Sequence, residues 1–409
     1  MKRVGIVGLL IVASATSNGA ETLDLSGEAG FEARWFPQSP LFDGQRSSTG
    51  GLVVEPTLWG DISERTSVTV SFLYRYDSAD SHRTHGDLRE AYLMTYGDWG
   101  DASWEIRLGV GRVFWGVAEL NNVVDIVNQL DLVEHPRNRP KLGQPMVHLT
   151  LAGTWGTLES FLLPYHRTRT FPGTAGRLRS RFLIEDDALY EDSSDNRNVD
   201  FAVRYTNSVG LLDFGLSVFD GTSREASFVV SGETNTSAFT QGRLTPYYEQ
   251  IRQFGIDAQF TTEQVLYKLE AVEVGGARNL FSEEESYRAF ILGAEHSIYS
   301  LLGSAASLTL LGEWHYDDRG SRATSVWAND LFIAGFLSLN DVPGTEFVAG
   351  LLGDIDHEYR ALNLEFKRRL SSNWSLRIES IVILSSDPMD LTYDGRRDSF
   401  LGMGLYANF

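Results

Sequence analysis

Apolar and polar side chains alternate along most of the chain. Residues 25–35 carry an apolar or small side chain at nearly every second position, with Glu28 and Glu32 among the polar residues between them. Residues 66–77 and 103–110 repeat the pattern, as do several later segments. A period of two places one kind of side chain on each face of an extended strand. The alternation therefore predicts an all-β protein whose strands have one apolar and one polar face.

The alternating segments divide into eighteen candidate strands, and the weaker pair within 329–354 leaves sixteen as the fallback. Many of them run over about a dozen residues, whereas strands of soluble proteins are mostly about 5–6 residues long. A strand of about 12 residues, tilted by about 40°, spans roughly 30 Å, the thickness of the hydrocarbon core of a bilayer. The expected strands are 24–36, 50–62, 66–77, 86–97, 103–114, 145–155, 157–166, 198–208, 210–220, 250–261, 264–275, 287–298, 305–316, 329–339, 345–354, 357–369, 373–385 and 397–409.

Short and long connections follow one another along this series of strands. The longest expected loops are 115–144, 167–197 and 221–249, and the links on the other side are short turns. Bacterial outer-membrane barrels have short periplasmic turns and long extracellular loops. An open sheet edge would leave unpaired backbone groups in lipid. We therefore expect a closed, antiparallel, up-and-down transmembrane β-barrel; the alternative, a soluble β-sandwich, does not explain strand length and loop asymmetry together.

Aromatic residues gather near both expected ends of the strands. Trp99, Trp155 and Trp374 lie beside short turns, and Trp35 and Tyr76 lie beside long loops. Two aromatic girdles, one at each interface, are typical of a barrel that spans a membrane. Their placement favours the membrane barrel over the sandwich.

The N-terminus carries an export signal. Lys2 and Arg3 precede an apolar run of about ten residues, and small residues follow as far as Ala20. This order is typical of a secretory signal peptide. We expect residues 1–20 to be removed, with cleavage after Ala15 as the alternative, and the rest of the chain, 21–409, to form a single barrel domain.

The C-terminus ends in an alternating strand. Leu401, Met403 and Leu405 lie on its apolar side, which runs up to the terminal Phe409. This end resembles the terminal signature of bacterial outer-membrane proteins, which the barrel-assembly machinery reads. The resemblance implies that this machinery is a partner through Phe409, and that the outer wall meets outer-membrane lipid and lipopolysaccharide.

Charge and composition exclude several classes of function. The 409 residues include 35 Lys and Arg against 55 Asp and Glu, a net charge of −20. A nucleic-acid-binding protein needs a basic face, so no nucleic-acid partner is expected. The absence of cysteine excludes thiolate zinc sites, cysteine nucleophiles and disulfides. We expect no cofactor and no bound metal and, without a visible interface pattern, a monomer.

If the apolar faces meet lipid, the polar faces line the lumen. Ionisable side chains lie on these faces all around the wall, and they cannot form a dry core because unpaired buried charge is too costly. We expect a water-filled channel whose walls carry both signs of charge; the alternative is a lumen filled by its own loops. The candidate pore-lining residues are Arg75, Glu105, Arg107, Arg112, Arg204 and Arg377.

Residues 116–144 form the longest stretch without alternation. Apolar residues from Val123 to Leu130 recur at roughly helical spacing, which predicts a short helix that ends before Pro136. A loop with its own apolar face can fold into the barrel as a constriction or plug; a compact external loop is the alternative. The candidate constriction residues are Trp115, Asp125, Asn128 and Asp131. The last three also carry oxygen ligands suited to Ca²⁺, although a solvated face or a cap explains their spacing better.

The same region resembles a known family. It reads Gly109-x-Gly111-Arg112, then Trp115-Gly116, then Asp125-x-Val127-Asn128-x-x-Asp131, and it is preceded by Arg89-Glu90-Ala91-Tyr92-Leu93. This pattern resembles the middle of a family of proteobacterial outer-membrane barrels that are distantly similar to alginate-export porins. The resemblance covers the fourth to sixth expected strands and implies a barrel for export or uptake.

A basic and an acidic stretch adjoin each other in the loop 167–197. Arg177, Arg179 and Arg181 share one face if the segment is extended, and an acidic stretch follows at 185–195. The three arginines are candidate contacts for an anionic solute or for lipopolysaccharide phosphate. The alternative, favoured because the charges nearly cancel, is a hairpin whose basic arm pairs with its acidic arm.

Catalytic patterns are weak. His82 and His85 lie in one expected loop at a spacing that gives little support for a metal, and His148 could meet Ser160 on the next strand as a hydroxyl–imidazole pair. The chain has no Gly-x-Ser-x-Gly elbow. We therefore expect no enzymatic activity.

Together these patterns predict an outer-membrane channel that passes a solute through a polar lumen. A plugged barrel that exports a hydrophobic or polymeric substrate with an inner-membrane partner is the first alternative. An outer-membrane enzyme that acts on lipid is the second. An open lumen favours the channel, and a lumen closed by 116–144 or 167–197 favours the plugged barrel.

Overall fold

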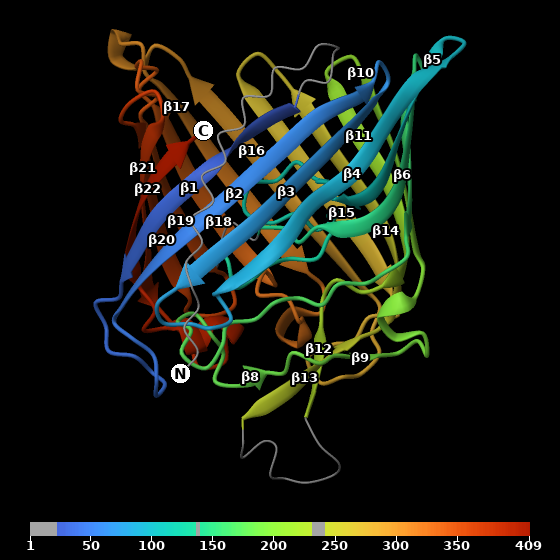
Figure 1. Cartoon of the computed structure of the whole chain (residues 1–409). Helices are drawn as coiled ribbons and strands as arrows, with labels where there is room; N and C mark the ends of the chain where they lie inside the picture. The colour runs from blue at the N-terminus through green and yellow to red at the C-terminus, as the bar shows by residue number, and fades with distance from the viewer. Residues whose placement is uncertain (1–22, 136–139, 231–241) are drawn as a thin grey trace, which may run out of the picture.

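Eighteen strands form one closed antiparallel sheet (Figure 1). The computed structural model describes residues 23–135, 140–230 and 242–409, so the expected signal peptide, 1–20, lies outside the described residues. Each barrel strand pairs with the next one along the chain, and the last pairs with the first. The predicted up-and-down barrel of eighteen strands is confirmed, including the two strands within 329–354.

Most of the barrel strands are long, as the alternation predicts. They are β1 (Leu23–Trp35), β2 (Ser48–Ser63), β3 (Thr66–Asp77), β4 (His85–Trp99), β5 (Ala102–Gly111), β6 (Gln144–Gly153), β7 (Gly156–Leu163), β10 (Asp200–Val209), β11 (Leu212–Thr222), β14 (Gln250–Thr261), β15 (Val265–Gly275), β16 (Tyr287–Ile298), β17 (Ser307–Asp317), β18 (Asn329–Ser338), β19 (Glu346–Asp354), β20 (Arg360–Arg369), β21 (Trp374–Ser385) and β22 (Phe400–Asn408). Phe409 exchanges backbone hydrogen bonds with Gly27, which completes the closure between β22 and β1.

The connections at the two ends of the barrel differ in length. Turns such as 100–101 and 154–155 join strands at the end where β1 begins, which we call the short-turn end. Segments such as 112–143 and 164–199 join strands at the opposite, long-loop end. The long loops carry a small second sheet, which the sequence did not predict. Its strands are β8 (Leu183–Ile184), β9 (Leu189–Tyr190), β12 (Ser227–Val230) and β13 (Arg243–Tyr248).

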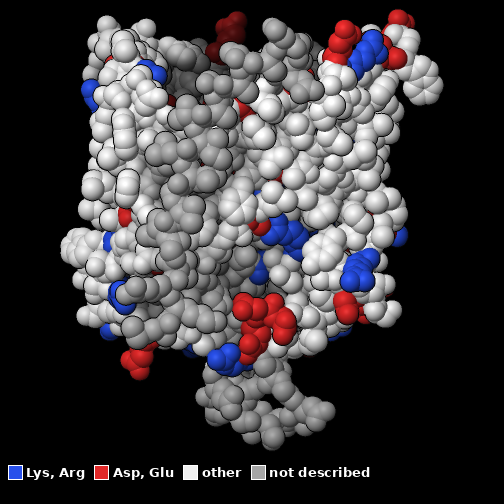
Figure 2. Space-filling model, viewed as in Figure 1, with Lys and Arg blue, Asp and Glu red and all other residues white. Residues whose placement is uncertain are grey.

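The outer wall is apolar. Phe31, Phe72, Leu108 and Phe254 are among its exposed large hydrophobic side chains. Figure 2 shows a largely uncharged wall in its upper half, with Lys, Arg, Asp and Glu toward the two ends of the barrel. An exposed apolar surface of this extent marks contact with a membrane or another apolar partner. No helix in the described part of the chain is long and apolar enough to cross a membrane.

The largest apolar core lies inside the barrel, between the wall and one loop. Trp115, Val124 and Val127 of the segment 112–143 are almost fully buried and belong to the same cluster as Phe161 of β7 and Phe219 of β11. The teal trace of this segment passes through the barrel interior in Figure 1. Local contact between loop and wall therefore replaces water over part of the lumen.

Candidate functional site

The segment 112–143, which we call the inward segment, is folded without a helix. Its described residues, 112–135 and 140–143, form turns, bends and the short bridge between Leu130 and Lys141. The short helix predicted from Val123 to Leu130 is therefore wrong. Val123, Val124 and Val127 pack against the barrel wall, and the backbone N–H of Val124 donates to Glu270 of the wall instead of to a helix carbonyl.

Glu270 of β15 is the first of these acceptors. Its Oε1 accepts hydrogen bonds from the backbone N–H groups of Val117 and Ala118, at 2.7 and 2.9 Å, and from Nδ2 of Asn122 at 2.8 Å. Its Oε2 accepts from the N–H of Val124 at 3.4 Å. Because each buried amide must find a partner, this carboxylate holds one turn of the inward segment on the wall.

Glu313 of β17 holds the neighbouring residues. Its two carboxylate oxygens accept hydrogen bonds from the backbone N–H groups of Glu119 and Leu120, at 2.7 and 3.1 Å. The side chain of Glu119 in turn accepts from Nζ of Lys268 at 3.2 Å. Two wall carboxylates thus bind consecutive backbone amides of one loop, in place of the water that an open lumen would supply.

Asn128 joins the beginning of the inward segment to its end. Its Oδ1 accepts from the backbone N–H of Val113, and its Nδ2 donates to the carbonyls of Gly111 and Leu142, all at 2.9 Å. Asp125 accepts from the backbone N–H of Trp115 at 3.3 Å. The proposed constriction residues therefore lie inside the barrel and shape the inward segment itself.

Asp131 and Glu134 lie among arginines. Asp131 accepts from Arg89 at 2.8 Å and from Thr170 at 2.7 Å, and Arg75 donates to Glu134 at 2.8 Å. His85 lies 3.4 Å from each of the two carboxylates, so these three residues could surround an ion. Since both carboxylates already have guanidinium partners, we assign them to an ion-pair network. His82 does not belong to this group and contacts the carbonyl of Phe171 at 3.2 Å.

All six proposed pore-lining residues form ion pairs: the five arginines have acidic partners, and Glu105 is the partner of Arg107. Arg75 pairs with Glu32 and Glu134, Arg107 with Glu105 at 2.7 Å, Arg112 with Glu55 and Glu90 at 3.5 and 3.3 Å, Arg204 with Asp257 at 2.8 Å, and Arg377 with Glu28 at 2.9 Å. All of these partners come from other positions on the barrel wall or from the inward segment. The ion pairs of Arg75, Arg107 and Arg112 occupy the lumen on the side formed by β1 to β5.

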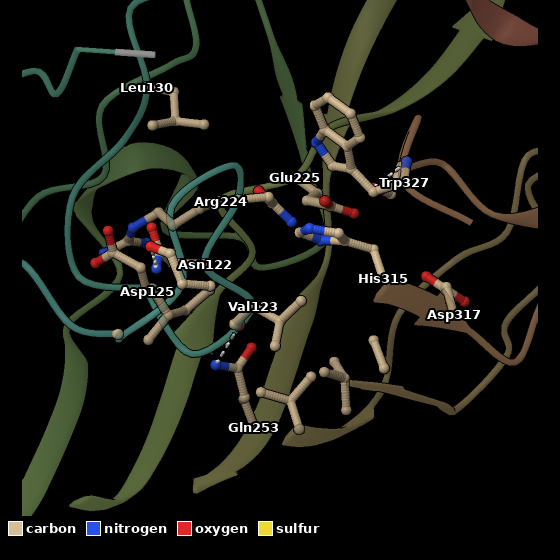
Figure 3. Close-up of a pocket in the computed structure, with 18 of the residues that line it drawn as sticks. Asn122, Val123, Asp125, Leu130, Arg224, Glu225, Gln253, His315, Asp317 and Trp327 are labelled. Carbon is tan, nitrogen blue, oxygen red and sulfur yellow. Dashed lines mark hydrogen bonds between the residues drawn. The ribbon is translucent and has the colours of Figure 1, made fainter. Parts of the chain in front are cut away.

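The opposite side of the lumen holds a cavity of about 890 Å³ (Figure 3). Its mouth is at the long-loop end, where Arg224 and Glu225 lie. Asn122 and Val123 of the inward segment form one wall, and Gln253 and His315 of the barrel form the other. A dashed line in Figure 3 marks the contact between Nε2 of Gln253 and the carbonyl of Val123, at 3.5 Å. The lining contains both signs of charge, in addition to the aromatic rings of Tyr287, Tyr316 and Trp327.

A second cavity, of about 380 Å³, lies toward the short-turn end. It is lined by Arg204 and Asp257 and by residues at the turn ends of β6, β7, β10 and β11. Gly116, Val117 and Gln259 line both cavities. The two cavities are therefore neighbours at these three residues, the first toward the long-loop end and the second toward the short-turn end.

Glu249, between β13 and β14, lines the mouth of the first cavity and is 3% exposed. Burial raises the pKa of its carboxyl to about 7, although hydrogen bonds from the Arg278 N–H and from Ser227 Oγ oppose the shift. The folded-state pKa exceeds the ordinary value of 4.5, so its stabilising contribution is complete below pH 4.5 and is lost as pH rises through 7.

We expect the Tm of the detergent-folded wild type to fall between pH 5 and pH 8 by more than that of Glu249→Gln, whose side chain does not ionise. Melting curves followed by circular dichroism measure the difference. Glu263→Gln, in an exposed turn, serves as the control, and its Tm should change with pH as that of the wild type does. Equal slopes for wild type and Glu249→Gln would contradict the assignment.

Two of the three arginines of the loop 164–199 pair with a different loop, 386–399. Arg177 donates to Asp398 at 2.6 Å, and Arg181 to Asp394 at 2.9 Å. Arg179 donates to the carbonyls of Thr174 and Ser180. Arg177 and Arg179 are buried, so contact with an anionic solute or lipopolysaccharide at these two positions would require the loops to open. The acidic arm 185–195 is not their partner.

His148 and Ser160 lie on opposite faces of the wall. The register of β6 and β7 pairs His148 with Phe161 and Leu149 with Ser160. The His148 ring faces inward, stacks on Phe161 at 4.0 Å and contacts Glu159 at 3.1 Å. The hydroxyl–imidazole pair considered from the sequence is therefore not formed, because adjacent positions in paired strands point to opposite faces.

The strand alternation directs Glu270 and Glu313 into the lumen, but it does not indicate their role. Each is an acid at an inward position of a strand that is otherwise mostly apolar, which is the signal that was available. Their partners lie about 150 and 194 residues away in the chain. No local pattern indicates which loop such an acid holds.

Comparisons with known proteins add little. No protein-family model and no curated protein matches the chain, so the resemblance to barrels of the alginate-export kind stays a prediction. Solved structures that resemble it include one described as "Asymmetric conductivity of engineered proteins", with 10% identity and a TM-score of 0.45, and a triple mutant of the porin of Rhodopseudomonas blastica, with 11% identity and a TM-score of 0.42. The first alignment covers 95% of this chain and 100% of the other chain. At this identity and score the likeness carries no argument about function.

Proposed function

We propose that the protein is a constricted outer-membrane channel that passes small hydrophilic solutes along the cavity side of its lumen. The observation that supports this proposal is that two neighbouring cavities, one toward each end of the barrel, share the lining residues Gly116, Val117 and Gln259. The apolar outer wall supports insertion into the lipid and lipopolysaccharide of the outer membrane. Phe409, at the end of the closing strand, is the position that we expect the barrel-assembly machinery to read.

The charge on the route favours polar solutes. Arg204 and Asp257 face the second cavity, and Lys268 and Glu365 face the first. Paired charges of both signs keep water in a lumen without imposing a strong preference for one sign of ion. We therefore propose passage of small neutral or zwitterionic solutes, limited by size where the inward segment narrows the lumen.

Swelling of proteoliposomes in iso-osmotic sugars tests the proposal. Liposomes that contain the folded barrel should swell in a pentose or hexose solution and swell more slowly as the sugar grows to a trisaccharide. Protein-free liposomes are the control. No swelling with any sugar, from a barrel shown to be folded by its heat-modifiable gel mobility, would contradict it.

A plugged barrel is the second candidate, because Glu270 and Glu313 fix the inward segment through backbone hydrogen bonds. In that case a partner or a substrate would have to displace the segment before transport. The swelling experiment separates the two candidates, since a plugged barrel without its partner passes no sugar.

A further inference from the structure

Two aspartates face each other at the long-loop end of β18 and β19. The strand register pairs Asp330 directly with Asp354, and both side chains point into the barrel, with exposures of 1% and 4%. Like charges in directly opposite positions of a sheet destabilise it. A buried pair of this kind needs a compensating positive charge.

A third carboxylate and an imidazole complete the group. Asp390 comes from the loop 386–399, and His357 from the turn after β19. Asp354, His357 and Asp390 each place a possible ligand atom within 4.8 Å of the others. We call these residues, together with Asp330, the rim cluster.

Backbone groups fix these carboxylates in place. Oδ1 of Asp354 accepts from the N–H groups of Asp356 and His357, both at 2.7 Å. Oδ1 of Asp390 accepts from the N–H of Thr392 at 2.6 Å, at the start of the short helix Leu391–Gly395. The orientation of both side chains is therefore set before any ligand arrives, which is a condition for a specific ion site.

An unpartnered oxygen points to a missing ligand. Oδ2 of Asp330 is buried and has no hydrogen-bond partner within the described part of the chain. Asp330 lies directly across from Asp354 on the inward face of the strand pair, which places its carboxylate beside the group of Asp354, His357 and Asp390. A buried carboxylate oxygen without a donor is rare in a folded protein and calls for an unseen ion or water.

The basic partner of these carboxylates is His357, whose Nδ1 lies 3.3 Å from Oδ2 of Asp354. The neighbouring guanidinium of Arg360 does not add to it. Nη1 of Arg360 donates to the backbone carbonyls of Asp354, His357 and Tyr359. Among the described residues, no Lys or Arg forms an ion pair with a carboxylate of the rim cluster. Burial, with a further contribution from Asp354, raises the pKa of Asp390, as expected for carboxylates that share a site.

We propose that the rim cluster binds one divalent cation through carboxylate oxygens of Asp330, Asp354 and Asp390, with His357 beside them. Carboxylates suit Ca²⁺ and Mn²⁺, whereas a carboxylate set with an imidazole also suits Zn²⁺. The ion would join β18 and β19 to the loop 386–399. That loop holds Arg177 and Arg181 through Asp398 and Asp394, so the ion would fasten two loops over the mouth of the barrel.

Calorimetric titration of the EDTA-treated, folded barrel with CaCl₂ and separately with ZnCl₂ tests the site. We expect saturable binding of one ion per chain, at least about tenfold weaker in Asp330→Asn and in Asp390→Asn. Asp186→Asn, an exposed acid at the same end, and Asp131→Asn, in the other carboxylate–histidine group, are controls that should bind as wild type. His357→Ala distinguishes the ions, because it should weaken Zn²⁺ binding far more than Ca²⁺ binding.

A second readout does not depend on the heat of binding. Trypsin should cleave after Arg396 or Arg397 in the loop 386–399 more slowly when the bound ion is present, and EDTA should restore cleavage. Gel mobility before and after heating shows that each variant is folded. Absence of saturable binding of either ion, or binding that persists unchanged in both Asp330→Asn and Asp390→Asn, would overturn the proposal.

Discussion

Replacing Glu270 and Glu313 together by alanine is expected to raise the single-channel conductance of the barrel by about twofold or more. The change removes the acceptors of five backbone N–H groups in the inward segment. A hydrogen bond to a charged group contributes about 1.5–3 kcal/mol, and a buried amide left without a partner costs about 1–3 kcal/mol. Without these acceptors, the free energy of the segment is lower when its amides are hydrated than when they stay against the wall. The segment then leaves the wall, and the lumen becomes wider.

Planar-bilayer recordings of the double variant measure this effect. The open-channel current should also become noisier, because the released segment moves within the lumen. Glu263→Ala, in an exposed turn of the same wall, should conduct as wild type. A double variant that is folded but conducts as wild type would show that these two carboxylates do not hold the constriction.

Gln259→Trp is expected to have the opposite effect and to lower the conductance to less than about half. Gln259 lies on β14, faces the lumen and lines both cavities where they meet. An indole at this position fills the narrow part of the proposed route without changing its charge. The barrel itself should fold normally, because the outward face of β14 is untouched.

The same recordings give the result, with Gln259→Asn as the control that shortens the side chain and should not lower the current. Thr150→Trp, on the inward face of β6, adds a second control away from the three shared residues. If Gln259→Trp conducts as wild type while remaining folded, ions do not pass between the two cavities and another path must be sought.

The barrel could be predicted from the sequence because its strands follow a local rule. Every strand of the barrel faces lipid, so every strand needs an apolar outward residue at every second position. Each strand can therefore be recognised from its own sequence, without knowledge of the strands that it pairs with. Even in β18, one of the two strands where the alternation is weakest, Leu331 and Ile333 are exposed on the outer face while Phe332 and Ala334 are buried. The loop asymmetry follows from the same assignment of strands.

The interior could not be predicted in the same way. Val123, Val124, Val127 and Leu130 are spaced as in a helix, yet the segment is irregular. Wall carboxylates far away in the sequence bind the amides of residues 117–120 and of Val124. Likewise, Arg177 pairs with Asp398, 221 residues away, instead of with the acidic stretch beside it. Such pairs depend on which segments face each other across the closed barrel. The alternation of apolar and polar residues within a strand carries no information about these contacts.

We propose that the lumen beside the inward segment is open to ions. Single-channel recording of the folded wild-type barrel in a planar bilayer, with the reversal potential measured under a salt gradient, tests it most directly. We expect stable ohmic steps and a reversal potential near zero, because charges of both signs line the route. A folded barrel that inserts into the bilayer and gives no steps would contradict it.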